Sequence, residues 1–441
     1  MEDLRALRSR ALAALLLPVF AASTAFAQGE PVTSSPGTSD KPQSKIWYND
    51  GFYWAILQTS SGSYIFKLVQ GDWSRQNFVD SRVNNGVDGR EDVLWNGSEL
   101  FVLVHSSRPK LYKYSYSSSS DTYDLFSGFP ISLSIASGSE TIVLDQDSTG
   151  RLWAAYEGGG KVYVAYSISS DHRSWETPGV VLRSGLDADD IASVVRFGGD
   201  KVGVFWSDQS RWEFGFSYHR DSNPPDDWSS VEIVDAGTGR SDDHINLAAD
   251  VQGRVFAITK DASDEFTVYR RSSSGNWTAK RDISKGTSGT RPIIMLDTTD
   301  KKIHALYTCW SCSGPDRISY QVGSMETLSF GSKQTFLRDA AKSMNDVTGM
   351  KQILPPGSLV AIAVAGGTAY WSGWGTPPAG NGMWYEGDGE PPPPPPPPLE
   401  PPGTPADLVV GGATRNAPPG VVASYLFDEE SGETVKNAAD A

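Results

Sequence analysis

The sequence predicts an all-β protein whose main domain is a seven-bladed β-propeller with four strands in each blade. A unit of about 50 residues recurs seven times, and each copy holds short apolar and aromatic runs separated by turn residues. Aromatic residues make up 11% of the chain, which also has 44 glycines, so strands and turns are favoured. Four short strands at this period are typical of a propeller blade, whereas a pair of β-sandwiches would not give seven regular units.

An apolar run forms the expected second strand of each repeat. Successive runs begin 48, 52, 50, 53, 48 and 56 residues apart, and this spacing defines the period. The runs begin at Phe52, Leu100, Leu152, Val202, Val255, Ile303 and Leu359.

An aromatic-rich run follows as the third strand, and an aromatic residue precedes the fourth strand in six repeats. We expect most of these rings to pack between neighbouring blades. The seventh repeat lacks a clear fourth strand, which residues 383–386 or the segment before Lys45 could supply. Third strands are expected from Tyr64, Leu111, Val162, Phe214, Phe266, Arg317 and Ala369, and fourth strands after Trp73, Tyr123, Trp175, Trp228, Trp277 and Phe330.

The segments that flank the repeats differ in composition. Residues 1–27 contain three arginines, an apolar run and small residues at the end, the pattern of a secretory signal peptide, so we expect a secreted or periplasmic protein. Residues 28–44 are polar and are predicted to be a disordered lead-in. The propeller is assigned to 45–376. Residues 377–420 form a linker that contains eight consecutive prolines, a stiff polyproline II spacer.

Residues 421–441 read VVASYLFDEESGETVKNAADA. The run from Tyr425 to Glu429, followed by the turn residues Ser431 and Gly432, resembles the opening strand and turn of laminin-G-like, concanavalin A-type jelly rolls. The resemblance implies the start of a truncated second domain, because so short a piece cannot bury a core of its own.

The charge excludes one class of partner. The chain has 38 Lys and Arg against 53 Asp and Glu, a net charge of -15, and nucleic acids require a basic face. After the signal peptide no segment reaches the roughly 18 apolar residues of a membrane span. We expect a monomer.

Cys309 and Cys312 are the two cysteines of the chain. In an oxidising compartment they are predicted to form a local disulfide. Zinc would need two further ligands, and no Cys or His pair has a suitable spacing, so no metal site is assigned.

Carboxylates on adjacent loops could alternatively hold Ca²⁺, which takes about six or more oxygens. These carboxylates are Asp187, Asp189, Asp190, Asp242 and Asp243.

The candidate site lies where loops gather around the central channel. In a propeller, the connections between blades and the loops between strands two and three open on one face. The catalytic candidates are His244, which Asp243 would orient, with Arg291 and Lys351 to hold a carboxylate or sulfate. The same residues could instead cap turns or pair with acids of the next blade. The ligand-binding candidates are Asn246, Asp190, Asn345, Lys260, Trp310 and Trp212.

Residues 169–175 (SSDHRSW) resemble the Asp-box hairpin of sialidase-like (BNR-type) propellers, although they lack its glycine and are one residue short. In that family a Ser, an Asp and a Trp lock the turn between strands three and four. Residues 147–153 are a looser relative, placed between strands one and two. The resemblance covers most of residues 45–376 in architecture.

The resemblance implies a protein that acts on or binds glycans. Sialidases are six-bladed and use three arginines, whereas Arg291 is the one comparable arginine here. Seven-bladed polysaccharide lyases are therefore the closer comparison. By that analogy His244 is the base, Arg291 and Lys351 hold the uronate, and Tyr307 or Tyr320 is the acid.

Three functions remain open at this stage. The protein could cleave an extracellular polysaccharide as a lyase or glycoside hydrolase, or bind polysaccharide, a cell-surface glycan or a protein without cleaving it. It could also be a passive adhesion scaffold.

Overall fold

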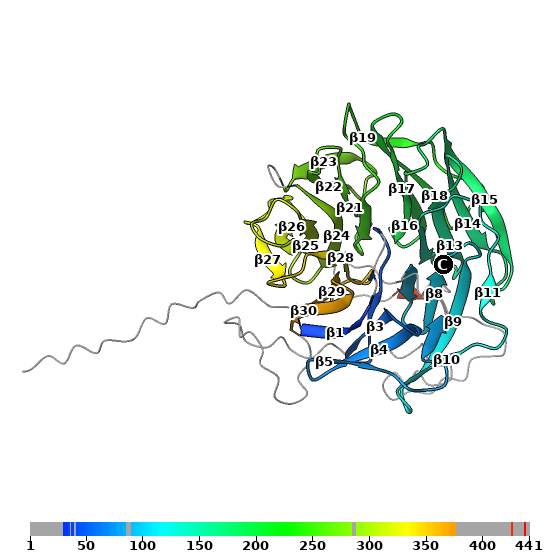
Figure 1. Cartoon of the computed structure of the whole chain (residues 1–441). Coiled ribbons are helices and arrows are strands. Elements are labelled where there is room, and N and C mark those ends of the chain that lie inside the picture. Colours follow the sequence, from blue (N-terminus) through cyan, green and yellow to red (C-terminus); the bar gives the residue numbers. More distant parts are fainter. Residues whose placement is uncertain are drawn as a thin grey trace, which may run out of the picture. The chain divides into compact units, whose positions relative to one another are not determined.

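The computed structural model describes residues 30–35, 37–38, 41–84, 90–284, 288–375, 425–426 and 436–437. Within these residues there is no helix, and seven antiparallel sheets form the ring of a propeller (Figure 1). The all-β class and the seven blades are confirmed. The predicted signal peptide and the linker after residue 376 lie outside the described residues.

The blades follow the chain in order, with the first strand of each blade at the channel. Blade one contains β2 (Ile46–Asn49), β3 (Phe52–Thr59), β4 (Gly62–Val69) and β5 (Asp72–Arg75). Blade two contains β7 (Glu91–Trp95), β8 (Glu99–Val104), β9 (Lys110–Ser117) and β10 (Thr122–Leu125). Blade three contains β12 (Ile142–Gln146), β13 (Leu152–Glu157), β14 (Lys161–Ser167) and β15 (Trp175–Ser184). Blade four contains β16 (Ala192–Phe197), β17 (Lys201–Asp208), β18 (Glu213–Arg220) and β19 (Glu232–Ala236).

The remaining blades have the same strand order. Blade five contains β20 (Ile245–Ala249), β21 (Val255–Lys260), β22 (Phe266–Arg271) and β23 (Trp277–Asp282). Blade six contains β24 (Gly289–Asp297), β25 (Lys302–Cys309), β26 (Arg317–Ser324) and β27 (Gln334–Leu337). Blade seven contains β28 (Met344–Thr348), β29 (Leu359–Ala365), β30 (Thr368–Trp374) and β1 (Glu30–Ser34). Two short strands, β6 (Arg82–Asn84) and β11 (Ile131–Ser132), pair with β4 and β9.

Every predicted second and third strand coincides with an observed strand. The fourth strands of blades four and six begin later than expected. Trp228 and Phe330, which were expected to open them, make only isolated bridges to the third strand of their blades.

Aromatic side chains pack between blades, as predicted. Trp47 and Trp54 of blade one lie with their ring centroids 5.6 and 5.0 Å from Tyr123 of blade two. Trp153 of blade three lies 5.6 Å from Trp228 of blade four. Since these edge-to-face pairs bury large apolar surfaces, they hold adjacent sheets together.

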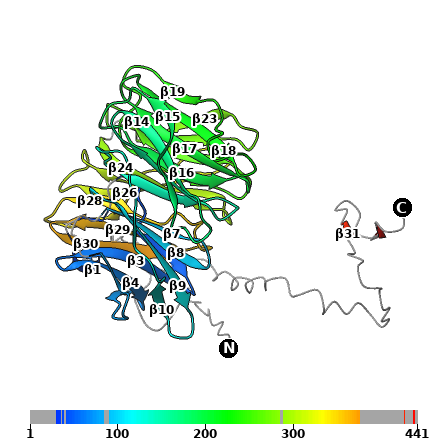
Figure 2. The same ribbon diagram turned by 90° about the vertical axis from the view of Figure 1, so that its right-hand side faces the viewer.

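The N-terminal segment closes the ring. β1 pairs antiparallel with β30 and is the outermost strand of blade seven, beside β30 in both views (Figure 1 and Figure 2). The prediction of a disordered lead-in over 28–44 is therefore wrong for its described residues, and the alternative that this segment completes blade seven is confirmed. The polar composition of this segment does not indicate a strand. Its partner strand, β30, lies more than 300 residues away in the sequence, so the pairing leaves no local pattern.

A second unit spans residues 390–441. Its described residues form two short antiparallel strands, β31 (Tyr425–Leu426) and β32 (Lys436–Asn437). The rest of the predicted jelly roll lies outside the described residues. Among the residues that the structure describes, no helix is long and apolar enough to cross a membrane.

Candidate functional site

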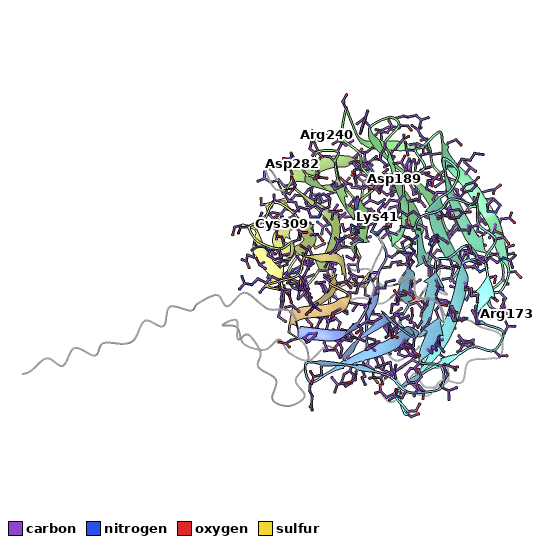
Figure 3. The ribbon with its side chains drawn as sticks, in the orientation of Figure 1. Lys41, Arg173, Asp189, Arg240, Asp282 and Cys309 are labelled. Carbon is purple, nitrogen blue, oxygen red and sulfur yellow. A yellow bond between two sulfur atoms is a disulfide. The ribbon has the colours of Figure 1, made fainter. Side chains whose placement is uncertain are left out.

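The channel is occupied by the chain itself. We call the described residues between β1 and β2, which are 35, 37–38 and 41–45, the arm. Lys41 of the arm lies near the centre of the ring (Figure 3), where its Nζ is 2.7 Å from Glu140 Oε2 of blade three and contacts Asp243 of blade five. The backbone N–H of Ser44 donates to Asp92 Oδ1 of blade two at 2.9 Å. The arm therefore crosses the channel and contacts several blades.

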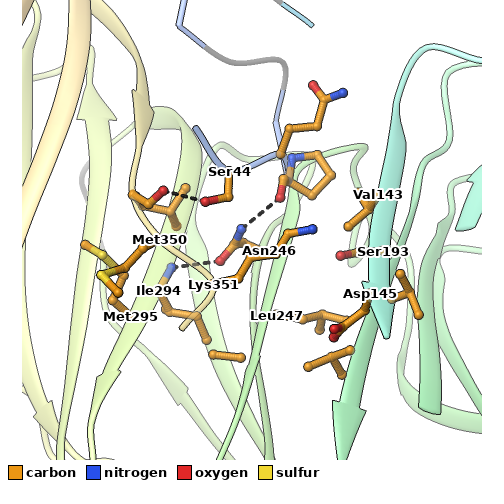
Figure 4. A pocket seen from close by; sticks show the side chains of 17 residues that line it. Ser44, Val143, Asp145, Ser193, Asn246, Leu247, Ile294, Met295, Met350 and Lys351 are labelled. Atoms are coloured by element: carbon orange, nitrogen blue, oxygen red, sulfur yellow. Dashed lines mark hydrogen bonds between the residues drawn. The ribbon is translucent and has the colours of Figure 1, made fainter. Parts of the chain in front are cut away.

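The space left beside the arm is small. A cavity lined by Ser44, Val143, Asn246, Ile294 and Lys351, among others, has a volume of about 40 Å³ (Figure 4). At roughly 10–15 Å³ for each water centre, this volume admits a few water molecules. It does not admit a sugar ring, so this cavity inside the channel is not a saccharide site.

Polar side chains of the first strands connect neighbouring blades. Asp92 Oδ2 accepts a hydrogen bond from the N–H of Leu144 at 2.7 Å, and Asn246 Oδ1 accepts one from the N–H of Ile294 at 3.0 Å. Similar bonds join Asp145 to Arg196 and Thr348 to Lys45. The inner edge of a blade has no further strand to satisfy its N–H groups, so these acceptors are needed. Asn246, predicted to bind ligand, has this structural role.

His244 is buried, with 8% of its surface exposed. Its Nδ1 lies 2.6 Å from Asp242 Oδ1 and 2.5 Å from Asp243 Oδ1, so the predicted contact with Asp243 exists beside a second one. Its Nε2 lies 2.9 Å from Thr290 Oγ1. Burial lowers the pKa of His244 to about 4, against the opposing effect of Asp242, so the ring is neutral at pH 7. Both ring nitrogens are engaged, which does not favour a role as general base.

The two predicted anion-binding cations are paired with acids inside the protein. Arg291 Nε lies 2.8 Å from Asp346 Oδ1 of the next blade. Lys351 Nζ contacts the Asp92 carboxylate and donates to the carbonyl of Leu144 at 2.6 Å. Their charges are neutralised at two different carboxylates, and they do not form the predicted clamp.

Three of the predicted ligand-binding residues also serve the fold. Asp190 is fully buried and accepts hydrogen bonds from Ser207 Oγ and from the N–H of Asp187. Asn345 accepts a hydrogen bond from Thr308 Oγ1 at 3.0 Å. The Lys260 amine lies 3.1 Å from a carboxylate oxygen of Asp242 and 3.1 Å from one of Asp264.

The two tyrosines named as possible acids are buried as well. The Tyr307 hydroxyl donates to Gln321 Oε1 at 2.8 Å, and the Tyr320 hydroxyl lies 2.7 Å from His304 Nδ1. Burial raises the pKa of both phenols, so they are poor proton donors near neutral pH.

Carboxylates do gather at the mouth of the channel. Glu140, Asp189 and Asp243 place one oxygen each within 4.8 Å of one another, and so do Asp242, Asp243 and His244 with one ligand atom each. Lys41 pairs with two of these acids and Lys260 with a third. The protein thus supplies its own cations at this point, and Ca²⁺ binding stays a prediction.

Trp212 and Trp310 differ from the other candidates because they are exposed, by 37% and 44%. Trp212 has a φ of +56°, a left-handed conformation that is unusual for a bulky residue. Trp310 lies in the loop closed by the Cys309–Cys312 disulfide, which is confirmed, and Lys260 Nζ lies 5.6 Å from its ring centroid.

A continuous row of loops joins the two tryptophans. We call the loops that join β17 to β18, β19 to β20, β21 to β22 and β25 to β26, together with Ser288 and Gly289 where the chain enters β24, the Trp rim. Trp212 and Trp310 are at its two ends, on the face where the arm enters. Backbone hydrogen bonds link the row: Gly237 N–H to Trp212 O, Ala262 N–H to Gly239 O, Gly289 N–H to Asp264 O and Trp310 N–H to Ser288 O. Sequence reasoning named both tryptophans, but not the fixed row between them.

The Asp-box-like segment forms the turn between β14 and β15. Ser169 Oγ donates to Asp171 Oδ1 at 2.6 Å, and Trp175 Nε1 donates to the carbonyl of His172 at 2.9 Å. In the looser copy between β12 and β13, Trp153 Nε1 donates to Asp147 Oδ2 at 2.8 Å. Both segments act as turn locks, which does not by itself establish a sialidase-type protein.

Several solved structures have a similar propeller fold, and lectins are among them. No known protein family and no curated protein matches the chain. The BP39L lectin from Burkholderia pseudomallei is similar with a TM-score of 0.55 and 12% identity, over 78% of this chain and 98% of the lectin. AofleA from Arthrobotrys oligospora gives 0.47 and 9%, over 72% and 92%. The periplasmic gluconolactonase PpgL of Pseudomonas aeruginosa gives 0.45 and 12%, over 76% and 98%. At these identities the likeness shows the fold alone.

Proposed function

We propose that this protein binds carbohydrate outside the cytoplasm, without cleaving it, at the Trp rim. The observation that carries the proposal is the exposure of Trp212 and Trp310 at the two ends of one fixed row of loops. The C–H face of a sugar ring is apolar and stacks on a flat aromatic ring, while polar loop atoms between the rings can bind hydroxyl groups.

Binding is favoured over cleavage because the catalytic candidates are not available. His244 has both ring nitrogens engaged, and Arg291 and Lys351 are paired with acids. The similarity in fold to a lectin is consistent with binding. A protein exported by the predicted signal peptide would meet extracellular or cell-surface glycans.

Replacing Trp212 or Trp310 by alanine is expected to weaken glycan binding at least about tenfold. Aromatic side chains that become covered by the ligand dominate the binding energy of such contacts. The melting temperature should not change, because both side chains are on loop surfaces. A glycan array finds the ligand, and calorimetry then measures its affinity. Val251→Ala, at a 77% exposed valine in the turn between β20 and β21, is the matched control.

Two results would overturn the proposal. One is unchanged glycan binding in the double variant Trp212→Ala/Trp310→Ala. The other is release of unsaturated or reducing ends from a uronate polysaccharide that His244→Ala abolishes, since this would make the protein an enzyme.

A further inference from the structure

A second cavity opens on the loop face of blade six. It is lined by Ser313, Pro315, Arg317, Arg338, Asp339 and Ala340, and its volume is about 250 Å³. At the same roughly 10–15 Å³ for each water centre, this volume admits about 17 to 25 water molecules. That is enough for one monosaccharide unit, unlike the space in the channel.

The walls of this cavity are tied together. One wall is the loop between β25 and β26, which the Cys309–Cys312 disulfide braces, and the other is the connection between β27 and β28. The N–H of Met344 donates to the carbonyl of Asp316 at 2.9 Å, and the N–H of Asp316 donates to Ser343 Oγ at 3.2 Å. These hydrogen bonds therefore tie the start of β26, which carries Arg317, to the connection that carries Arg338.

Two guanidinium groups and one carboxylate line this cavity of an otherwise acidic protein. Arg317 contacts the carbonyl of Ser313 and donates to Thr335 Oγ1 at 3.4 Å, and no ion pair joins it to a carboxylate of the described residues. Its Nε is buried and has no hydrogen-bond partner among those residues. Arg338 adds a second guanidinium.

The acidic and basic side chains around the two arginines set the local charge. Asp339 is the one carboxylate that lines the cavity, and its Oδ1 accepts hydrogen bonds from the N–H groups of Ala341 and Lys342. Burial, and then the positive charge of Arg317, lowers the pKa of the Lys333 amine. The positive charge of Arg317 therefore disfavours the protonated form of the Lys333 amine.

We propose that this cavity binds the carboxylate or sulfate group of an acidic saccharide through Arg317 and Arg338. A guanidinium offers planar, paired N–H donors that match a carboxylate or sulfate, and it keeps its charge at any physiological pH. The saccharide part rests on the proposed function, because the loop that forms one wall also carries Trp310 of the Trp rim. The anion part stands on the cavity itself.

Calorimetry on the full chain tests this inference with glucuronate, the neutral glucuronate methyl ester, N-acetylglucosamine 6-sulfate and acetate. We expect glucuronate and the sulfated sugar to bind, the ester to bind at least tenfold more weakly, and added salt to weaken binding of the two anions. Arg317→Gln and Arg338→Gln should each weaken anion binding about tenfold or more. Arg75→Gln, at an exposed arginine of β5, should not.

The outcomes separate this inference from the proposed function. Equal affinity for glucuronate and its methyl ester, or unchanged anion binding in both arginine variants, overturns the anion site even if neutral glycans still bind at the Trp rim. Binding of acetate as tight as that of glucuronate overturns the saccharide part alone. Arg317→Lys, which keeps the charge but not the paired donors, is the second variant if Arg317→Gln does not fold.

Discussion

Deleting residues 30–34 is expected to lower the free energy of unfolding by about 4 kcal/mol. These residues form β1, which pairs with β30 at four residue pairs and closes blade seven. Each backbone hydrogen bond lost contributes about 1 kcal/mol net. The deletion also exposes the outer edge of β30, including Tyr370 and Trp371, which are each 8% exposed in the closed ring. An open, aromatic edge strand favours aggregation.

Urea unfolding followed by tryptophan fluorescence measures this effect. A milder variant, Val32→Asp, puts a charge where Val32 packs against the core around blade seven, and should lower stability in the same direction. Val79→Asp, at a position 97% exposed, is the matched control and should change stability by less than about 0.5 kcal/mol. An unchanged unfolding midpoint in the deletion variant would show that β1 does not close the ring.

The ring itself could be predicted because its evidence is local and repeated. Each blade carries an apolar run and an aromatic-rich run in the same order, so seven weak signals support one another. β1 has no such support, since five residues with a proline and two hydroxyl side chains resemble a linker. These residues form a strand because the outer edge of β30 offers backbone groups to pair with, and that edge is distant in the sequence.

The candidate site shows the same limit at the level of side chains. The sequence placed His244, Arg291 and Lys351 at the channel, and they do lie on the strands and connections around it. Their partners could not be predicted, because Lys351 and Asp92 are 259 residues apart and Lys41 and Asp243 are 202 apart. Long-range ion pairs of this kind leave no pattern in spacing.

The Arg317 cavity was missed for a related reason. Arg317 was recognised only as the first residue of a third strand, a position that ordinarily faces solvent or a neighbouring blade. The cavity exists because residues 338–340, from the connection to blade seven, lie opposite it. A composition signal, two arginines near a disulfide loop of an acidic protein, could have pointed to this region.

Replacing Lys41 by methionine is expected to cost about 3–5 kcal/mol of stability at pH 7. Lys41 is 6% exposed and contacts both Glu140 and Asp243, so the variant leaves two carboxylates at the channel mouth without their cation. Removing one partner of a buried pair has a penalty of this size. Lys302→Met breaks an exposed pair with Asp300 and should cost less than about 1 kcal/mol, which makes it the matched control.

The pH dependence identifies the cause of the loss. Without Lys41 the repulsion between the ionised Glu140 and Asp243 carboxylates is no longer offset, and protonation of either carboxylate relieves it. The deficit relative to the unmodified protein is then full near pH 7 and shrinks as the pH falls toward about 4. The double variant Lys41→Met/Asp243→Asn should recover part of the stability at pH 7. Urea unfolding at pH 7 and pH 5 distinguishes the causes. If the deficit is the same at both values, Lys41 acts by packing its alkyl chain in the channel, and its charge does not hold the arm in place.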